Sequence, residues 1–207
     1  MNLDMMLTHA PASLLLLISI AGFSFLGFRN PALTARCLLH PWVMFREHQY
    51  ERLLLSGFLH ADMMHLLFNL IALYAVSMHI EVAVGTTSFL LIYFGSLLLS
   101  GLPVAIRRRN SPEYRALGAS GAVSGLFFAG MLYFPEAKVM LLFLPIPMPW
   151  PVFSLLFILV SMYGAKTKWD AVAHDVHLYG AAAGFLIGLI IEPTSLGNLL
   201  RAIGFGG

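Results

Sequence analysis

The chain has 207 residues, of which 59% are hydrophobic and 11% are charged, and its formal net charge is +2. Because soluble domains carry about 25% charged residues, this composition excludes an ordinary soluble domain and indicates a protein that crosses a membrane several times. The small net charge gives no reason to expect a nucleic acid partner, and the single cysteine, Cys37, excludes an internal disulfide and a thiolate metal cluster.

Six apolar segments approach the roughly 20 residues that a transmembrane helix needs. We predict helices over residues 11–28, 61–84, 87–106, 120–134, 151–164 and 174–191. Gly85 separates the second helix from the third, and Pro135 ends the fourth. The first segment lacks the basic start of a signal peptide, so we expect it to be retained. The predicted fold is an all-α membrane protein, a single domain of six transmembrane helices over residues 1–207.

Two connections have features of their own. Residues 29–60 are too long and too mixed for a simple loop, and their aromatic and basic side chains suit the bilayer interface. Prolines at positions 145, 147, 149 and 151 exclude a helix before residue 151, where a proline fits the first turn of the fifth helix.

The predicted fourth and fifth helices are short for a membrane. Residues 120–134 span roughly 22 Å at about 1.5 Å each, against a hydrocarbon core of about 30 Å. If the far end reaches the opposite interface, Ser120 lies below the near one, where polar backbone needs protein or water beside it. We therefore predict a water-filled pocket at Ser120, and we expect the still shorter fifth helix to be the least firmly anchored.

Ser120 lies in the tetrapeptide Gly118-Ala-Ser-Gly121, at the predicted start of the fourth helix. Unpaired N–H groups at a helix start can stabilise a developing oxyanion. Gly121 and Gly125 also form a small-residue face that lets another helix approach closely. By itself, this motif fits helix packing better than catalysis.

His177 begins a glycine face on the sixth helix. Three glycines follow it on the same side, at spacings of three, seven and eleven residues: Gly180, Gly184 and Gly188. Packing of this face on the small-residue face of the fourth helix would bring His177 to Ser120, as the base that a serine nucleophile needs. Asp175 lies on a different face, so we predict a Ser–His dyad rather than a triad.

His65 and Asn69 lie four residues apart and share a face of the second helix. Both side chains can donate a hydrogen bond to a negatively charged oxygen, but a helix-to-helix hydrogen bond, worth about 0.6 kcal/mol in membranes, is an equal alternative. His60 precedes them at the predicted water boundary, where we expect it only to cap or anchor the helix.

A metal site is a weaker alternative for the polar residues. Six side chains could converge as nitrogen and oxygen ligands: His60, Asp62, His65, His174, Asp175 and His177. However, H-E-x-x-H is absent, and a spacing of five residues takes two histidines off the shared helix face. We therefore predict no metal and no other cofactor.

Together these motifs resemble those of the rhomboid family of intramembrane serine proteases. The pattern H-x-x-x-x-H-x-x-x-N is met at His60, His65 and Asn69, G-x-S-G at Gly118, Ser120 and Gly121, and H-x-x-G-x-x-x-G at His177, Gly180 and Gly184. The resemblance implies Ser120 as nucleophile and His177 as general base. It also implies an oxyanion site formed by the Ser120 N–H with His65 and Asn69.

The resemblance further implies a half-submerged first loop over residues 29–57 and a substrate gate formed by the fifth helix and residues 143–151. We expect Trp150 and Phe153 to hold this helix against the second helix. The implied substrates are transmembrane proteins within the lipid bilayer, and the oligomeric state stays open.

Two positions depart from the family pattern. Glu51-Arg52 stands where the family often has Trp-Arg, so only Arg52 carries over. Ser124 stands where many members have an aromatic residue that stacks on the histidine, so support for His177 has to come from elsewhere.

Two other classes compete with the protease. Catalytically silent relatives bind membrane proteins without cutting them, but this chain keeps both Ser120 and His177. A small transporter would show charges within its spans and repeat symmetry between its halves, and neither is evident.

Two arguments give opposite orientations for the pocket. All of the 12 lysines and arginines except Lys138 and Arg201 lie in connections on the side of Ser120, which the positive-inside rule assigns to the cytoplasm. Resemblance to bacterial rhomboids implies the bacterial inner membrane with the pocket facing outward. Part of this charge lies in a loop that we expect to fold into the interface, whereas the charges at residues 107–109 and 166–168 do not. We favour the outward orientation, because the motif match is stronger evidence than a charge count.

Overall fold

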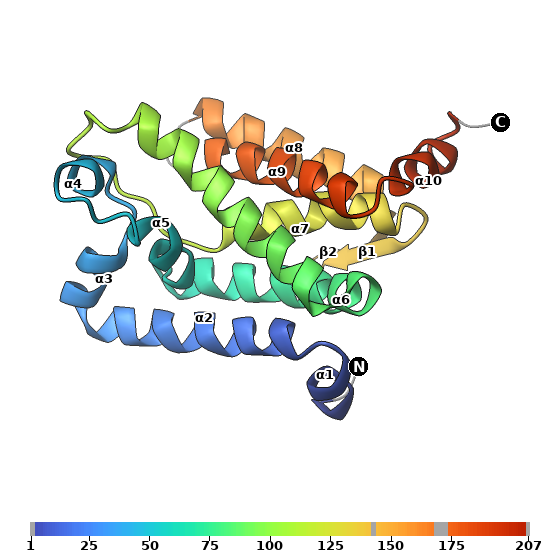
Figure 1. Ribbon diagram of the computed structural model, residues 1–207, viewed down its shortest axis with the longest axis horizontal. Helices are drawn as coiled ribbons and strands as arrows, with labels where there is room; N and C mark the ends of the chain where they lie inside the picture. The colour runs from blue at the N-terminus through green and yellow to red at the C-terminus, as the bar shows by residue number, and fades with distance from the viewer. Residues whose placement is uncertain (1–2, 142–143, 168–173, 206–207) are drawn as a thin grey trace.

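The computed structural model describes residues 3–141, 144–167 and 174–205, and this part of the chain is mostly helical (Figure 1). In chain order the elements are α1 (Leu3–His9), α2 (Pro11–Arg29), α3 (Pro31–Cys37), α4 (Pro41–Arg46), α5 (Arg52–Leu55), the 3-10 turn η1 (Ser56–Phe58), α6 (Met63–Arg107), α7 (Ser120–Tyr133), β1 (Lys138–Leu141), β2 (Leu144–Pro149), α8 (Trp150–Thr167), α9 (His174–Ile191) and α10 (Ser195–Ala202). By length and composition α2 and α6 could each cross a membrane, the bent pair α9–α10 is a third candidate, and α7 is a shorter apolar helix.

The predicted boundary at Gly85 is present, although α6 continues across it. Gly85 has φ 78° and ψ 159°, a backbone conformation outside the helical region that glycine tolerates best. The two halves of α6 consequently run in different directions (Figure 1). At its start, α6 is capped by Asp62, whose carboxylate accepts the His65 N–H at 2.8 Å.

Helices α7, α9 and the second half of α6 pack against one another, and small residues make this possible. A Cβ added to Gly180 would overlap the carbonyl group of Gly121, with the carbonyl carbon only 2.8 Å away. A Cβ on Gly184 would likewise overlap the backbone of Gly125. The side chains of Ser100 from α6 and Val176 from α9 both lie against the open Cβ position of Gly121. The predicted packing of two glycine faces is confirmed.

The long connection after α2 folds into α3, α4, α5 and η1. Arg52 is 6% exposed, and its Nη1 donates to the carbonyl oxygens of Ala35 and Leu38, both at 2.9 Å. Its Nε donates to Gln49 Oε1 at 2.7 Å. A guanidinium offers donors in several directions, so Arg52 holds this connection together from within.

The proline-rich segment before α8 forms a strand. β2 pairs with β1 in an antiparallel hairpin, and residues 142 and 143 between them lie outside the described part of the chain. Helix α8 has 18 residues and α7 has 14, so the prediction that the fifth helix ends at residue 164 and is the shorter of the two was wrong. The reason is that a glycine inside a helix costs only about 1 kcal/mol, and Gly164 does not end α8.

The prediction that Trp150 and Phe153 hold α8 against the second helix was also wrong, because both anchor it mainly on α7. Trp150 Nε1 donates to the carbonyl oxygen of Phe127 at 2.8 Å, and its ring stacks on Phe134. The Phe153 ring lies 4.8 Å from the Phe127 ring. A buried indole N–H requires an acceptor, and α7 provides it.

A buried carboxylate ties the start of α2 to α6. Glu81 is 1% exposed and accepts the backbone N–H groups of Ala12 and Ser13 at 3.0 and 2.7 Å. Thr86 Oγ1 donates to the same side chain at 2.8 Å. The first N–H groups of α2 have no acceptor within their own helix, so Glu81 serves as their acceptor.

Candidate active site

The backbone that leads into Ser120 is held by hydrogen bonds to other segments. Ala116 exchanges two backbone hydrogen bonds with Leu39, and Gly118 N–H donates to Ser56 O at 2.9 Å. Gly118 has φ +127°, which favours glycine, and a Cβ there would lie 2.9 Å from the ring of His65. Conformation and space therefore both require glycine two residues before Ser120.

His177 lies on the turn of α9 that faces the start of α7. Gly180, three residues after His177, contacts the backbone of Gly121. Val176, one residue before His177, has its Cγ1 2.9 Å from the position that a Cβ on Gly121 would take. Residues on both sides of His177 thus meet the residue that follows Ser120. The turn of α9 that carries His177 therefore packs against the first turn of α7, which begins with Ser120.

An aromatic side chain of α8 supports His177. The Phe157 ring lies 5.7 Å from the imidazole at an interplanar angle of 41°. Phe157 also stacks on Phe127 of α7, with ring centroids 5.9 Å apart. Ser124, which stands where many family members have an aromatic residue, instead donates its hydroxyl to the Ser120 carbonyl at 2.6 Å. The support for His177 that α7 lacks is therefore supplied by Phe157 of α8. No sequence pattern indicated this residue.

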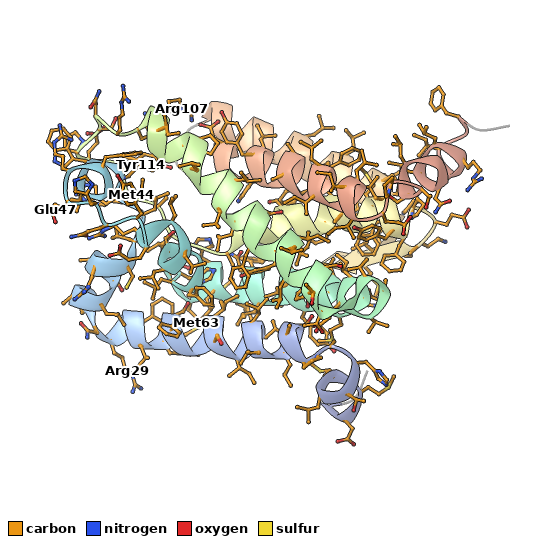
Figure 2. All side chains as sticks on the ribbon, in the orientation of Figure 1. Arg29, Met44, Glu47, Met63, Arg107 and Tyr114 are labelled. Carbon is orange, nitrogen blue, oxygen red and sulfur yellow. The ribbon has the colours of Figure 1, made fainter. Side chains whose placement is uncertain are left out.

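Asp175 pairs with a side chain of α6. Its carboxylate forms an ion pair with Arg107 at the end of α6, the end of the molecule where Figure 2 also shows Tyr114 and Glu47. This agrees with the prediction that Asp175 is not a third member of a triad. The side chain of His174 lies outside the part that the structure describes.

His65 and Asn69 occupy successive turns of α6. The ring of His65 lies beside Gly118, because a Cβ added to that glycine would be 2.9 Å from the ring. Asn69 is 7% exposed, and its Nδ2 donates to the carbonyl oxygen of His65 at 2.9 Å. His65 therefore adjoins the segment that carries Ser120, and Asn69 lies one turn further along the helix.

His60 is not at a water boundary, and the expectation that it only caps or anchors the helix was wrong. It is 3% exposed, its Nδ1 lies 3.0 Å from Ser24 Oγ, and its Nε2 lies 3.3 Å from the backbone nitrogen of Ala119. Burial, and then the neighbouring His65, lower the pKa of His60 to about 3. The cap is Asp62 instead. The polar Ser24 inside an apolar helix was the one sequence signal of a buried partner.

A small cavity adjoins Ser120. Its volume is about 50 Å³, and its lining includes the hydroxyl-bearing Ser56 and Ser100 as well as Gly118. A cavity needs roughly 10–15 Å³ to hold a water molecule, so this one is large enough for water, and most of its lining residues are apolar. A larger apolar groove of about 740 Å³ lies elsewhere, between α2, the first half of α6 and β1.

Among the residues that the structure describes, no group of three or more histidine, cysteine, aspartate or glutamate side chains is placed to hold a metal ion. The groups available for chemistry here are the Ser120 hydroxyl, the imidazoles of His65 and His177, the Asn69 amide and the N–H groups at the start of α7.

The geometry of these motifs agrees with a comparison against known protein families. The model of the Rhomboid domain matches residues 47–194, which is most of the chain. The chain belongs to the rhomboid family. This match contains all three motifs and ends just beyond α9.

Curated rhomboid relatives come from bacteria and from mitochondria. Rhomboid protein 1, mitochondrial, of Saccharomyces cerevisiae is 29% identical over 67% of this chain and 41% of its own length. The protein named "Putative rhomboid protease YdcA" of Bacillus subtilis is 30% identical over 69% of this chain and 67% of its own. Presenilin-associated rhomboid-like protein A, mitochondrial, of Danio rerio is 28% identical over 75% of this chain and 38% of its own. The matched region thus spans less than half of both mitochondrial relatives, and these names give the expected bacterial inner membrane no support.

Proposed function

We propose that this rhomboid is an intramembrane serine endopeptidase that cleaves transmembrane segments of membrane proteins with a Ser120–His177 dyad. The contact of Gly180 with the Gly121 backbone carries the proposal, because it sets the turn that holds His177 against the start of α7. Membership of a family that includes serine proteases supports the same reaction.

The proposed reaction uses groups on three helices. His177 takes the proton of Ser120 Oγ as that oxygen attacks the scissile carbonyl carbon. The C–N bond then breaks, the amine leaves with the proton from His177, and a water molecule hydrolyses the acyl-enzyme with the same base. We propose that this water enters through the cavity that Ser120 lines, whose volume is about 50 Å³.

The oxyanion of the tetrahedral intermediate needs donors that are in place before the reaction. We assign this role to the Ser120 N–H at the start of α7, to His65 and to Asn69. One N–H of the Asn69 amide is bonded to the carbonyl of His65, and the amide carries a second N–H that can serve the oxyanion.

The proposed architecture is six spans, formed by α2, the two halves of α6, α7, α8 and α9, with residues 29–57 half submerged on the side of Ser120. We further propose that α8 is the substrate gate, with Trp150 and Phe153 as its anchors. The apolar groove that Trp150 lines together with α2, the first half of α6 and β1 supports this, because it opens at the first residue of α8.

Labelling of the purified full chain with a fluorophosphonate probe tests the dyad. We expect wild type to be labelled and to cleave a single-span substrate, and Ser120→Ala and His177→Ala to do neither while remaining folded. Ser77→Ala is the matched control, because its hydroxyl is buried in α6 without a hydrogen-bond partner in the described part of the chain. Binding of the substrate by an unlabelled wild type would instead favour a catalytically silent rhomboid.

A further inference from the structure

Three separate segments meet at the imidazole of His60. Ser24 Oγ of α2 lies 3.0 Å from Nδ1, and the Ala119 backbone nitrogen, directly before Ser120, lies 3.3 Å from Nε2. Ser24 and Ala119 are fully buried, and His60 is 3% exposed. A polar group that is buried this deeply is normally hydrogen-bonded, and here both ring nitrogens have partners.

The partners determine where the proton of this ring lies. A backbone N–H can only donate, so Nε2 of His60 must accept from Ala119 with its lone pair. Because the ring is neutral in its buried position, its one proton lies on Nδ1 and is donated to Ser24 Oγ. The Ser24 hydroxyl in turn donates to the carbonyl oxygen of Phe58 at 3.1 Å. Only with the ring proton on Nδ1 does every donor in this chain of hydrogen bonds have an acceptor.

This arrangement constrains the backbone next to the proposed nucleophile. The N–H of Gly118 is bonded to Ser56 O at 2.9 Å, and the N–H of Ala119 is bonded to His60. The Ala119 carbonyl accepts the N–H of Val123 in the first turn of α7 at 3.0 Å. Both peptide groups before Ser120 are thus held in place, and they set the direction of the Ser120 N–H and side chain.

We propose that His60, locked in its Nδ1–H tautomer by Ser24, is a positioning residue that orients the Ala119 peptide and thereby Ser120. The inference rests on the proposed function, since it assigns no chemistry to His60 itself. A misplacement of about 1 Å at a reacting group can lower the rate about 10²-fold. The effect belongs to the chemical step, so it should change kcat and leave KM nearly unchanged.

Kinetics of paired variants test this role. We expect His60→Leu, which removes the acceptor, to lower kcat about 10²-fold per folded molecule. His60→Gln, whose amide oxygen can accept from Ala119, should recover most of this loss, and Ser24→Ala should fall between the two. Glu81→Gln is the control, since it perturbs an equally buried polar group that bonds the start of α2 rather than Ser24 or Ala119, and it should lower thermal stability but not kcat per folded molecule.

A spectroscopic measurement tests the tautomer without any turnover. In protein with 15N-labelled histidine, the His60 signals, identified by their loss in His60→Gln, should show a protonated Nδ1 and an unprotonated Nε2 at pH 7. Ser24→Ala should weaken this preference. This measurement also serves if His60→Leu fails to fold.

The outcomes separate this inference from the proposed function. An Nε2–H tautomer, or a His60→Leu protein with the kcat and KM of wild type, would overturn the positioning role while leaving the protease intact. Equal losses in His60→Gln and His60→Leu would overturn it as well. A wild type that neither labels nor cleaves would refute the proposed function, and with it the positioning role, whatever the tautomer.

Discussion

Replacement of Gly180 by alanine tests the contact on which the candidate site depends. The added Cβ would lie 2.8 Å from the carbonyl carbon and 3.0 Å from the Cα of Gly121, whereas ordinary contacts begin at 3.4 Å. Both obstacles are backbone atoms, so no side-chain rotation can relieve the overlap. Helices α7 and α9 must therefore separate by at least about 0.6 Å, the difference between 3.4 and 2.8 Å, at the turn that carries His177.

The cost of this separation has two parts. Overpacking of a tight interface destabilises a protein by about 1–3 kcal/mol. The displacement also moves the base away from the nucleophile, and a shift of about 1 Å at a reacting group can cost about 10²-fold in rate. We expect Gly180→Ala to lower both the thermal midpoint in detergent and kcat, with kcat reduced about 10²-fold.

Gly188→Ala is the matched control on the same face of α9. A Cβ at that position would meet Tyr133 Oη at 3.2 Å and Leu132 Cδ1 at 3.3 Å, at the far ends of side chains that can rotate. It would also meet Ala129 Cβ at 3.3 Å, only about 0.1 Å inside the ordinary contact distance of 3.4 Å. Thermal unfolding and steady-state kinetics of both variants decide the matter. If Gly180→Ala behaves like Gly188→Ala in both assays, the two helices do not meet as described and the argument for the dyad loses its basis.

Four further measurements address other parts of the molecule. Glu81→Ala should lower the free energy of unfolding by about 3 kcal/mol, because it leaves the first N–H groups of α2 without their charged acceptor; unchanged thermal unfolding would contradict this. Phe157→Leu should lower kcat more than it raises KM, since the ring beside His177 is lost, and Phe157→Tyr should retain activity. The unfolded chain binds a proton at His60 near pH 6.5 that the folded chain binds only near pH 3, so stability should fall as the pH drops below about 6.5, and His60→Gln should reduce this fall. In a Cys37→Ser background, Ser111→Cys should react with an impermeant maleimide on intact cells if the pocket faces outward; reaction only after lysis would place it in the cytoplasm.

The orientation experiment matters because the structure supports both sides of the argument. Arg29 and Arg107 lie at the end of the helices where the first connection folds (Figure 2), as the charge count assumes. However, Arg52 is buried and bonded to Ala35 and Leu38, so it is not a free loop charge. The positive-inside rule applies to charges in mobile loops near the spans, and Arg52 is not one of them.

Local sequence patterns were sufficient for the main helices and for the glycine packing. The predicted ends of the sixth helix coincide with those of α9, and the break at Gly85 occurs where predicted. Apolar runs end at residues that break helices or carry charge, and small residues recur at helical spacing wherever two backbones must approach. These signals lie within single segments, and therefore the sequence alone contains them. The short helices α1 and α10 were missed, because each is too brief to give a periodic signal.

The sequence by itself determined which residues can perform the proposed chemistry, because the hydroxyl, the imidazoles and the glycines occur at fixed spacings within individual helices. Only the tertiary structure decided what surrounds them. His60 is joined to Ser24 across 36 residues and to Ala119 across 59, and His177 meets Phe157 of another helix. The anchoring of Trp150 on α7 is of the same kind. Such contacts depend on how helices pack in three dimensions, where a buried polar group takes whichever partner the fold brings within hydrogen-bond distance, and no local spacing specifies that partner.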